Sequence, residues 1–105
     1  MFIKKDLRRI EEILQDDNDS KEFLKFSKRS AEFNGNIQIL CYEKHIRLME
    51  NVRNISLYDN KLISLNGIER FRELTCLQEI NLGNNQLSSL PTEVSEILLT
   101  IRNFD

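Results

Sequence analysis

Residue types that commonly support catalysis or cofactor binding are scarce in this chain of 105 residues. It has one histidine, three glycines, one proline and no tryptophan. The glycines are isolated from one another, so the sequence has no glycine-rich phosphate-binding loop. The single histidine, His45, has no serine or cysteine motif beside it, and we expect it in a turn at the surface. These absences predict a protein that is not an enzyme and has no cofactor.

The sequence also lacks the usual signs of a metal site or a disulfide framework. Cys41 and Cys76 are the two cysteines, and each lies within an apolar pattern far from the other. We expect both to be small buried side chains, because no Cys-x-x-Cys or Cys/His cluster is present. The acidic segment at residues 16–20 is similar to a calcium loop at its start, but it lacks the glycine and glutamate at the sixth and twelfth positions. We therefore predict no metal site.

Long apolar runs and a strong charge of one sign are absent as well. The net charge is -2, so composition gives no attraction to nucleic acid or to an anionic membrane. No apolar run is long enough for a transmembrane helix, and the first residues lack the apolar core of a signal peptide. We expect a single domain of an intracellular, cytoplasmic protein that binds neither nucleic acid nor membrane.

The most informative feature that is present is a pattern that occurs twice, with Asn60 and Asn85 in equivalent positions. Around them, the two copies align Ile55, Leu57, Leu62 and Leu65 with Ile80, Leu82, Leu87 and Leu90. The spacing is L-x-x-L-x-L-x-x-N-x-L-x-x-L, with Val or Ile at some Leu positions. It resembles the leucine-rich repeat family. Through Ile63–Glu69 it is loosely similar to the phosphatase-regulatory and dynein-light-chain-like subclass of that family.

This resemblance implies an α/β fold, namely a short right-handed β-α solenoid with a parallel concave sheet of about three strands. We expect an N-terminal helical cap at residues 1–36 and leucine-rich repeats at 37–105. Within the repeats we expect a degenerate copy at 37–51, full copies at 52–76 and 77–91, and a C-terminal capping helix at 92–105. Alternation of apolar residues at 37–42 predicts the strand of the degenerate copy. A chain cut from a longer repeat array would have a similar tail.

Two segments before the repeats have helical periodicity. Residues 2–15 place an apolar stripe on one side of an amphipathic helix. A second helix is predicted at 20–33, because Phe23, Phe26 and Phe33 recur at helical steps. The alternation at residues 23–26 also fits a short strand, and this alternative stays open.

In leucine-rich repeats, the residues between the inward-facing leucines project from the concave face. The resemblance therefore assigns to a partner-binding face Tyr42, Asn54, Ser56, Tyr58, Asp59, Glu79, Asn81 and Asn84. Tyr58 beside Tyr42 is the best candidate anchor, because aromatic residues with a polar group dominate interface energetics. Asn60 and Asn85 are implied to form a structural ladder that satisfies backbone groups of adjacent turns.

These expectations lead to two functional hypotheses. The first is a protein-protein interaction module, scaffolding or regulatory, that binds a protein or peptide partner through the concave face. The alternative is a truncated or degenerate repeat protein with a structural role and no specific ligand face. Such a protein would form a homo-oligomer through an exposed edge of the repeat sheet.

Overall fold

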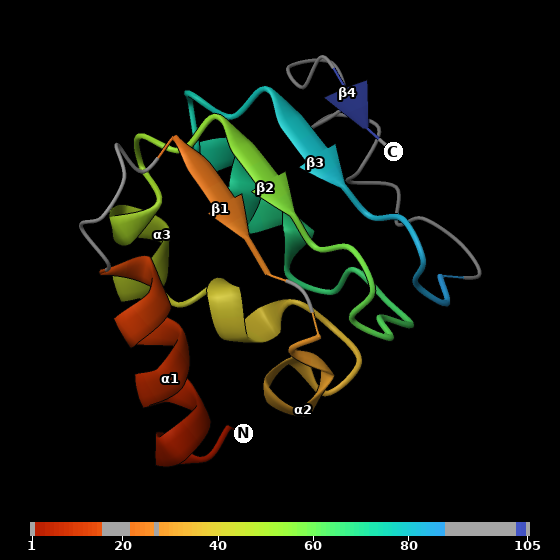
Figure 1. The fold of residues 1–105 in the computed structure, drawn as a ribbon. Coiled ribbons are helices and arrows are strands. Elements are labelled where there is room, and N and C mark those ends of the chain that lie inside the picture. Colours follow the sequence, from red (N-terminus) through yellow and green to blue (C-terminus); the bar gives the residue numbers. More distant parts are fainter. Residues whose placement is uncertain (1, 16–21, 27, 88–102, 105) are drawn as a thin grey trace.

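The computed structural model describes residues 2–15, 22–26, 28–87 and 103–104. They form a small α/β domain with an open parallel sheet (Figure 1). Three strands of three residues pair in sequence order, and the two-residue β4 pairs with β3. The elements, with η for a 3-10 helix, are α1 (Lys4–Leu14), β1 (Phe23–Lys25), α2 (Ser30–Phe33), η1 (Gln38–Leu40), α3 (Glu43–Leu48), β2 (Asn54–Ser56), η2 (Ile68–Glu73), β3 (Glu79–Asn81) and β4 (Asn103–Phe104).

The two sequence copies give two strands in matching register. Ile55 of β2 pairs with Ile80 of β3, and Leu24 of β1 pairs with Ile55. These three central side chains are buried. Because successive side chains of a strand point to opposite faces, the residues on either side of them point away from the core.

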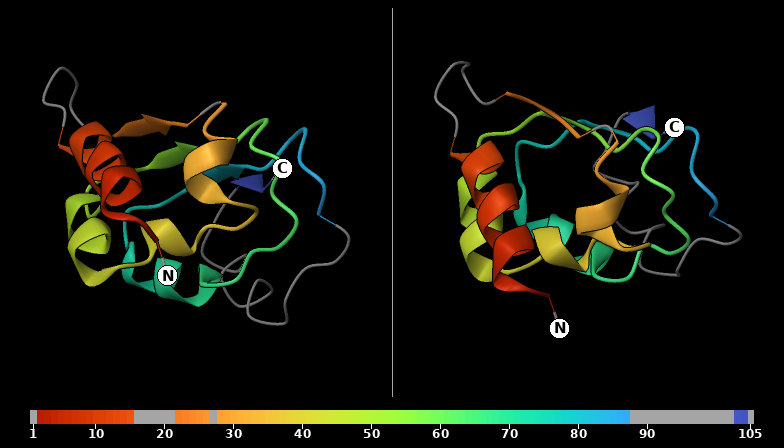
Figure 2. Two further views of the ribbon diagram at one scale, coloured as in Figure 1. Left: turned by 90° about the horizontal axis from the view of Figure 1, so that it is seen from below. Right: turned by 60° about the horizontal axis from the view of Figure 1, so that its bottom comes forward.

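The helices lie on one side of this sheet. Figures 1 and 2 show α1, α3, η1 and η2 beneath the strands, while the described residues place no helix over the opposite face. The space between the sheet and the helices is filled by a single apolar cluster that includes Leu57, Leu62 and Phe71. Phe26 and Phe33 meet edge to face in this cluster, with ring centroids 5.6 Å apart. One face of the sheet is therefore in the core and the other is exposed.

The amphipathic helix predicted at residues 2–15 is confirmed as α1. Ile10 and Leu14 are buried at its inner side, and Arg8, Arg9 and Glu12 are exposed. No helix in the described part of the chain has the length and apolar composition needed to cross a bilayer.

The helix predicted at 20–33 is wrong over most of its length. Residues 23–25 form strand β1, and only Ser30–Phe33 is helical. Phe23 is exposed while Leu24 and Phe26 are buried, so the local period is two and the phenylalanines do not share a helical face. The strand alternative at residues 23–26 is the one that the structure shows. Residues 23–25, expected within a helical cap, thus lie in the sheet.

The strand predicted at residues 37–42 is also wrong. Gln38–Leu40 is a 3-10 helix, followed by the start of α3. Ile37, Ile39 and Leu40 are all fully buried, so this segment has no alternation between a buried and an exposed face. Residues 38–40 lie beneath the sheet on the helical side (Figure 1). The position beside β2 that was expected for the strand at 37–42 is occupied by β1.

Residues 92–102 of the C-terminal helix predicted at 92–105 lie outside the described residues. Residues 103–104 pair with β3 as strand β4, with Phe104 opposite Ile80. The expected helix therefore does not extend to Phe104.

Candidate interaction face

The exposed side of the sheet carries a compact set of side chains in two rows across the strands. Phe23, Asn54 and Glu79 are neighbours in one row of the pairing register. The second row consists of Lys25, Ser56 and Asn81. Tyr58 and Gly83 follow β2 and β3 beyond these rows. We refer to these residues, together with Asp59 and Asn84, as the sheet face.

Tyr58 lies against the backbone of the neighbouring strand. A Cβ atom added to Gly83 would be 3.1 Å from Cδ1 and 3.3 Å from Cε1 of the Tyr58 ring, closer than ordinary van der Waals contact. The absence of a side chain at Gly83 therefore lets the ring rest on this strand. The Tyr58 residue remains 47% exposed. The Tyr58 ring therefore packs against the backbone at Gly83 and remains accessible to a partner.

Polar side chains beside Tyr58 are held by hydrogen bonds. Oδ1 of Asn81 accepts the backbone N–H of Gly83 at 2.8 Å. Nδ2 of Asn84 donates to Oδ1 of Asp59 at 3.1 Å, which links the turns after β3 and β2. Because these side chains are already ordered, less rotamer entropy is lost when a partner binds them.

Asn60 lies beneath the sheet face and is fully buried. Its Oδ1 accepts the backbone N–H of Arg29 at 2.7 Å. Its Nδ2 donates to the carbonyl oxygens of Phe26 at 2.8 Å and Tyr58 at 3.2 Å. One side chain thus satisfies backbone groups of its own turn and of the preceding one. The geometry is that of the ladder rung implied for this position.

Asn85 repeats the arrangement one turn later. Its Oδ1 accepts the backbone N–H groups of Asn60 at 2.9 Å and Leu62 at 3.0 Å. Its Nδ2 donates to the carbonyl oxygens of Leu57 and Leu82, each at 2.9 Å. The two asparagines fix the turns from which the residues of the sheet face project.

Tyr42 does not join the sheet face, although the sequence pattern assigned it there. It immediately precedes α3 and packs edge to face against Phe2 and His45, with centroid separations of 6.1 and 5.9 Å. The assignment failed because it required a strand at 37–42. The other predicted residues lie together after or within β2 and β3: Asn54, Ser56, Tyr58, Asp59, Glu79, Asn81 and Asn84.

Sequence reasoning did not include Phe23 and Lys25 in this face. Phe23 is 67% exposed on β1, which makes it the most exposed large apolar side chain among the described residues. The alternation of Phe23 and Lys25 with buried Leu24 and Phe26 was the signal that could have placed them. The helical spacing of the phenylalanines obscured this signal.

His45 and Cys76 are not where the sequence analysis expected them. His45 is only 4% exposed and lies in α3, where its ring is anchored at Ile39. Cys76 is exposed, because it lies in the turn after η2 and not at an inward position of the repeat.

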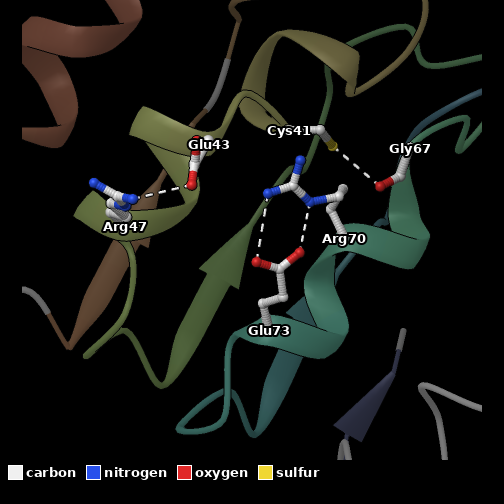
Figure 3. A network of polar contacts seen from close by, with 6 residues as sticks. All are labelled: Cys41, Glu43, Arg47, Gly67, Arg70 and Glu73. Carbon is white, nitrogen blue, oxygen red and sulfur yellow. Dashed lines mark hydrogen bonds and ion pairs between the residues drawn. The ribbon is translucent and has the colours of Figure 1, made fainter.

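Cys41 is partly buried, and its thiol donates to the carbonyl oxygens of Gly67 at 3.1 Å and Ile37 at 3.3 Å. Figure 3 shows the contact with Gly67 beside the Arg70–Glu73 ion pair. Burial raises the pKa of the Cys41 thiol to about 12. A thiol that stays protonated at neutral pH is a poor nucleophile and a poor metal ligand.

No group of three or more His, Cys, Asp or Glu side chains in the described parts of the chain is placed to hold a metal ion. No family model, curated protein or solved structure matches this chain. The function of the chain must therefore be inferred from the geometry of the sheet face itself.

Proposed function

We propose that this chain is a leucine-rich-repeat interaction module that binds a protein or peptide partner through the sheet face, in a scaffolding or regulatory role. The observation that carries the proposal is the Tyr58 ring, which is supported by Gly83 and half exposed within a polar surface. Tyrosine at such a position gives a large contact area with few rotatable bonds and a hydroxyl for hydrogen bonding.

Phe23 supplies a second apolar contact at the edge of the same face. Phe23 lies opposite Asn54, and Tyr58 follows Asn54 by four positions, which in an extended chain spans about 13 Å. The positions between them are polar: Lys25, Asn54 and Ser56. Two apolar anchors around a polar centre favour a partner that makes an apolar contact at each end and hydrogen bonds between them.

The solenoid architecture in this proposal is supported by the sequential order of the parallel strands and by the two asparagine rungs. The unit of β2 supplies a short strand, a turn closed by Asn60 and a helical return, η2, on the opposite side; β3 is likewise followed by an asparagine turn at Asn85. Stacking is what gives such units a continuous core, because one unit alone cannot bury its apolar side. A rigid stack of this kind is suited to presenting a fixed binding surface.

The test compares Tyr58→Asp with Ile63→Asp in the full chain. Ile63 is 60% exposed but lies outside the strands, so it controls for the loss of an exposed apolar side chain. Partners are captured by cross-linking in the native cell and quantified by mass spectrometry, and circular dichroism verifies folding. The proposal predicts that Tyr58→Asp abolishes a capture that Ile63→Asp retains. Equal capture by both variants would contradict it.

The alternative, self-assembly through a sheet edge, predicts a different pattern. Phe23 lies on β1, which pairs with β2 on one side in the described structure. In light scattering, Phe23→Glu would then lower the molar mass while Tyr58→Asp would not. Under our proposal neither substitution changes the molar mass.

A further inference from the structure

A second site lies on the helical side of the domain, in a cleft between α1 and α3. Its volume is about 340 Å³, and its wall is mainly apolar. The residues that line it are Lys4, Leu7, Arg8, Glu11, Tyr42, Lys44 and His45. This cleft contains the two residues, Tyr42 and His45, that the sequence pattern placed elsewhere.

His45 brings one hydrogen-bonding atom to the cleft. Its Nδ1 lies 2.7 Å from the carbonyl oxygen of Ile39. A carbonyl oxygen can only accept, so Nδ1 carries the proton and the neutral ring has its lone pair at Nε2. Every buried side-chain nitrogen and oxygen in the described structure has a partner, whereas His45 is bonded only through Nδ1. Nε2 is therefore accessible from outside the protein, and His45 is one of the residues that line this cleft.

An aromatic wall stands beside this acceptor. The ring of Tyr42 meets the His45 ring at 85° and the Phe2 ring at 74°, so it is held from both sides. The Glu11–Lys44 ion pair connects α1 with α3 at the same cleft. The result is a small, mainly apolar cleft with charged groups around it and one unpaired acceptor.

We infer that this cleft binds a single aromatic ring that carries an N–H or O–H donor, as in an indole or a phenol. The donor bonds Nε2 of His45, and the ring packs against Tyr42 and Leu7. The volume is at the lower end of the range of about 300–1,000 Å³ for ligand pockets, which suits one ring system more than an extended ligand. A ring without a donor would cover Nε2 and leave it unpaired, at a loss of about tenfold in affinity.

The probe is indole, and the control is 1-methylindole, which has the same ring but no N–H donor. His45 is the only histidine of the chain, so its imidazole nitrogen signals are unambiguous in a nitrogen-15 NMR titration of the full protein. The inference predicts a saturable shift of the Nε2 signal with indole and about tenfold weaker binding of 1-methylindole. No saturable shift, or equal affinity for the two compounds, would overturn it.

Two variants localise the binding without removing His45. Tyr42→Leu takes away the edge of the aromatic wall at a residue that is 42% exposed, so the core is left intact. Tyr58→Leu is the matched control on the sheet face. Indole affinity falls at least threefold in Tyr42→Leu and stays unchanged in Tyr58→Leu; the reverse pattern, or no change in either, contradicts the assignment.

The ring can come from a partner's tryptophan or tyrosine side chain or from a free small molecule. N-acetyltryptophanamide distinguishes these sources, because it carries the indole on a peptide backbone. Binding at least as tight as that of indole identifies a protein side chain as the ligand. Binding of indole alone identifies a free small molecule. Binding of neither compound overturns the inference.

Discussion

Asn85 closes the turn that contains Asn60: its Oδ1 accepts the backbone N–H of Asn60 at 2.9 Å. Asn60 makes the corresponding bond to the backbone N–H of Arg29 at 2.7 Å. Each asparagine therefore satisfies the turn before its own, which explains why one residue type recurs 25 positions apart. Asparagine is suited to this role because its amide both donates and accepts.

The first prediction concerns the loss of the Asn60 side chain and its hydrogen bonds to the backbone. Asn60→Ala leaves the partly buried N–H of Arg29 and the buried carbonyl of Phe26 without this partner. We expect the free energy of unfolding to fall by about 2–5 kcal/mol, because each unpaired buried group costs roughly 1–3 kcal/mol. Urea denaturation measures the change. Asn66→Ala is the control: Asn66 is an exposed asparagine without a positive φ, and its loss costs less than about 1 kcal/mol. Equal losses in both variants would refute the ladder as a source of stability.

The second prediction concerns Gly67, which has a φ of 97°. A Cβ atom there would lie 2.8 Å from Sγ of Cys41, a distance that real side chains do not adopt. Gly67→Ala therefore combines backbone strain with a steric clash, and we expect a loss of about 2–3 kcal/mol in thermal or urea unfolding.

The double variant Gly67→Ala/Cys41→Ala separates the two causes. Removing Sγ relieves the clash but leaves the strain of a positive φ, so the double variant should recover part of the loss. Losses that simply add, measured against Cys41→Ala alone, would show that the contact between residues 41 and 67 is irrelevant.

The repeat made the central part of the fold predictable. Ile55 and Ile80 lie in identical patterns, and two identical patterns bury the same residues and stack in register. The roles of Asn60 and Asn85 and the exposure of Tyr58 were implied by the resemblance of this pattern to leucine-rich repeats. These positions depend on local spacing, which the sequence displays directly.

The first strand could not be found in the same way. Leu24, Phe26 and Arg29 stand where the next unit has Ile55, Leu57 and Asn60, but the spacing is 31 residues and the asparagine is missing. Arg29 contributes only its backbone N–H to the asparagine ladder, beside the carbonyl oxygen of Phe26. β1 is the first strand of the described sheet, so the described structure contains no earlier turn for a side chain at position 29 to close. The Arg29 side chain instead pairs with Glu32.

The cleft between α1 and α3 could not be predicted for a different reason. Tyr42 and His45 face α1 because the segment at 37–40 is a 3-10 helix beneath the sheet and not a strand within it. The segment is a 3-10 helix and not a strand because Ile37, Ile39 and Leu40 are all buried by contacts with other parts of the chain. A pattern of alternation in the sequence cannot reveal it.

The third prediction separates the two thiols by reactivity. Cys76 is exposed, whereas Cys41 is partly buried with a pKa raised to about 12 by burial. At pH 8 we expect a disulfide reagent to modify Cys76 within seconds to minutes and Cys41 much more slowly, because little of the Cys41 thiol is ionised at that pH. In Cys76→Ser the modification should show only the slow phase, and in Cys41→Ser it should show only the fast phase. Two fast phases in the folded wild type would contradict the burial of Cys41.

The fourth prediction concerns the ion pair at the cleft between α1 and α3. The hydrogen bond from Lys44 is the main cause that lowers the pKa of Glu11 below the usual 4.5. A carboxyl group with a lowered pKa in the folded state contributes stability above its unfolded pKa, and this contribution is lost as the pH falls through the folded pKa. The wild type should therefore lose stability below about pH 4.5 more steeply than Lys44→Gln, which lacks the pair.

A carbon-13 NMR titration of the Glu11 carboxyl group measures the lowered pKa directly. Lys44→Gln should move the pKa of Glu11 upward, toward its usual value, because the donor and the positive charge are both removed. Arg47→Gln is a suitable control, because Arg47 is a cation of the same helix that pairs with Glu43 and not with Glu11. The ion pair is exposed on the lysine side, so a high salt concentration should weaken the difference between wild type and Lys44→Gln. A Glu11 pKa that does not respond to Lys44→Gln would show that Lys44 does not pair with Glu11 in solution.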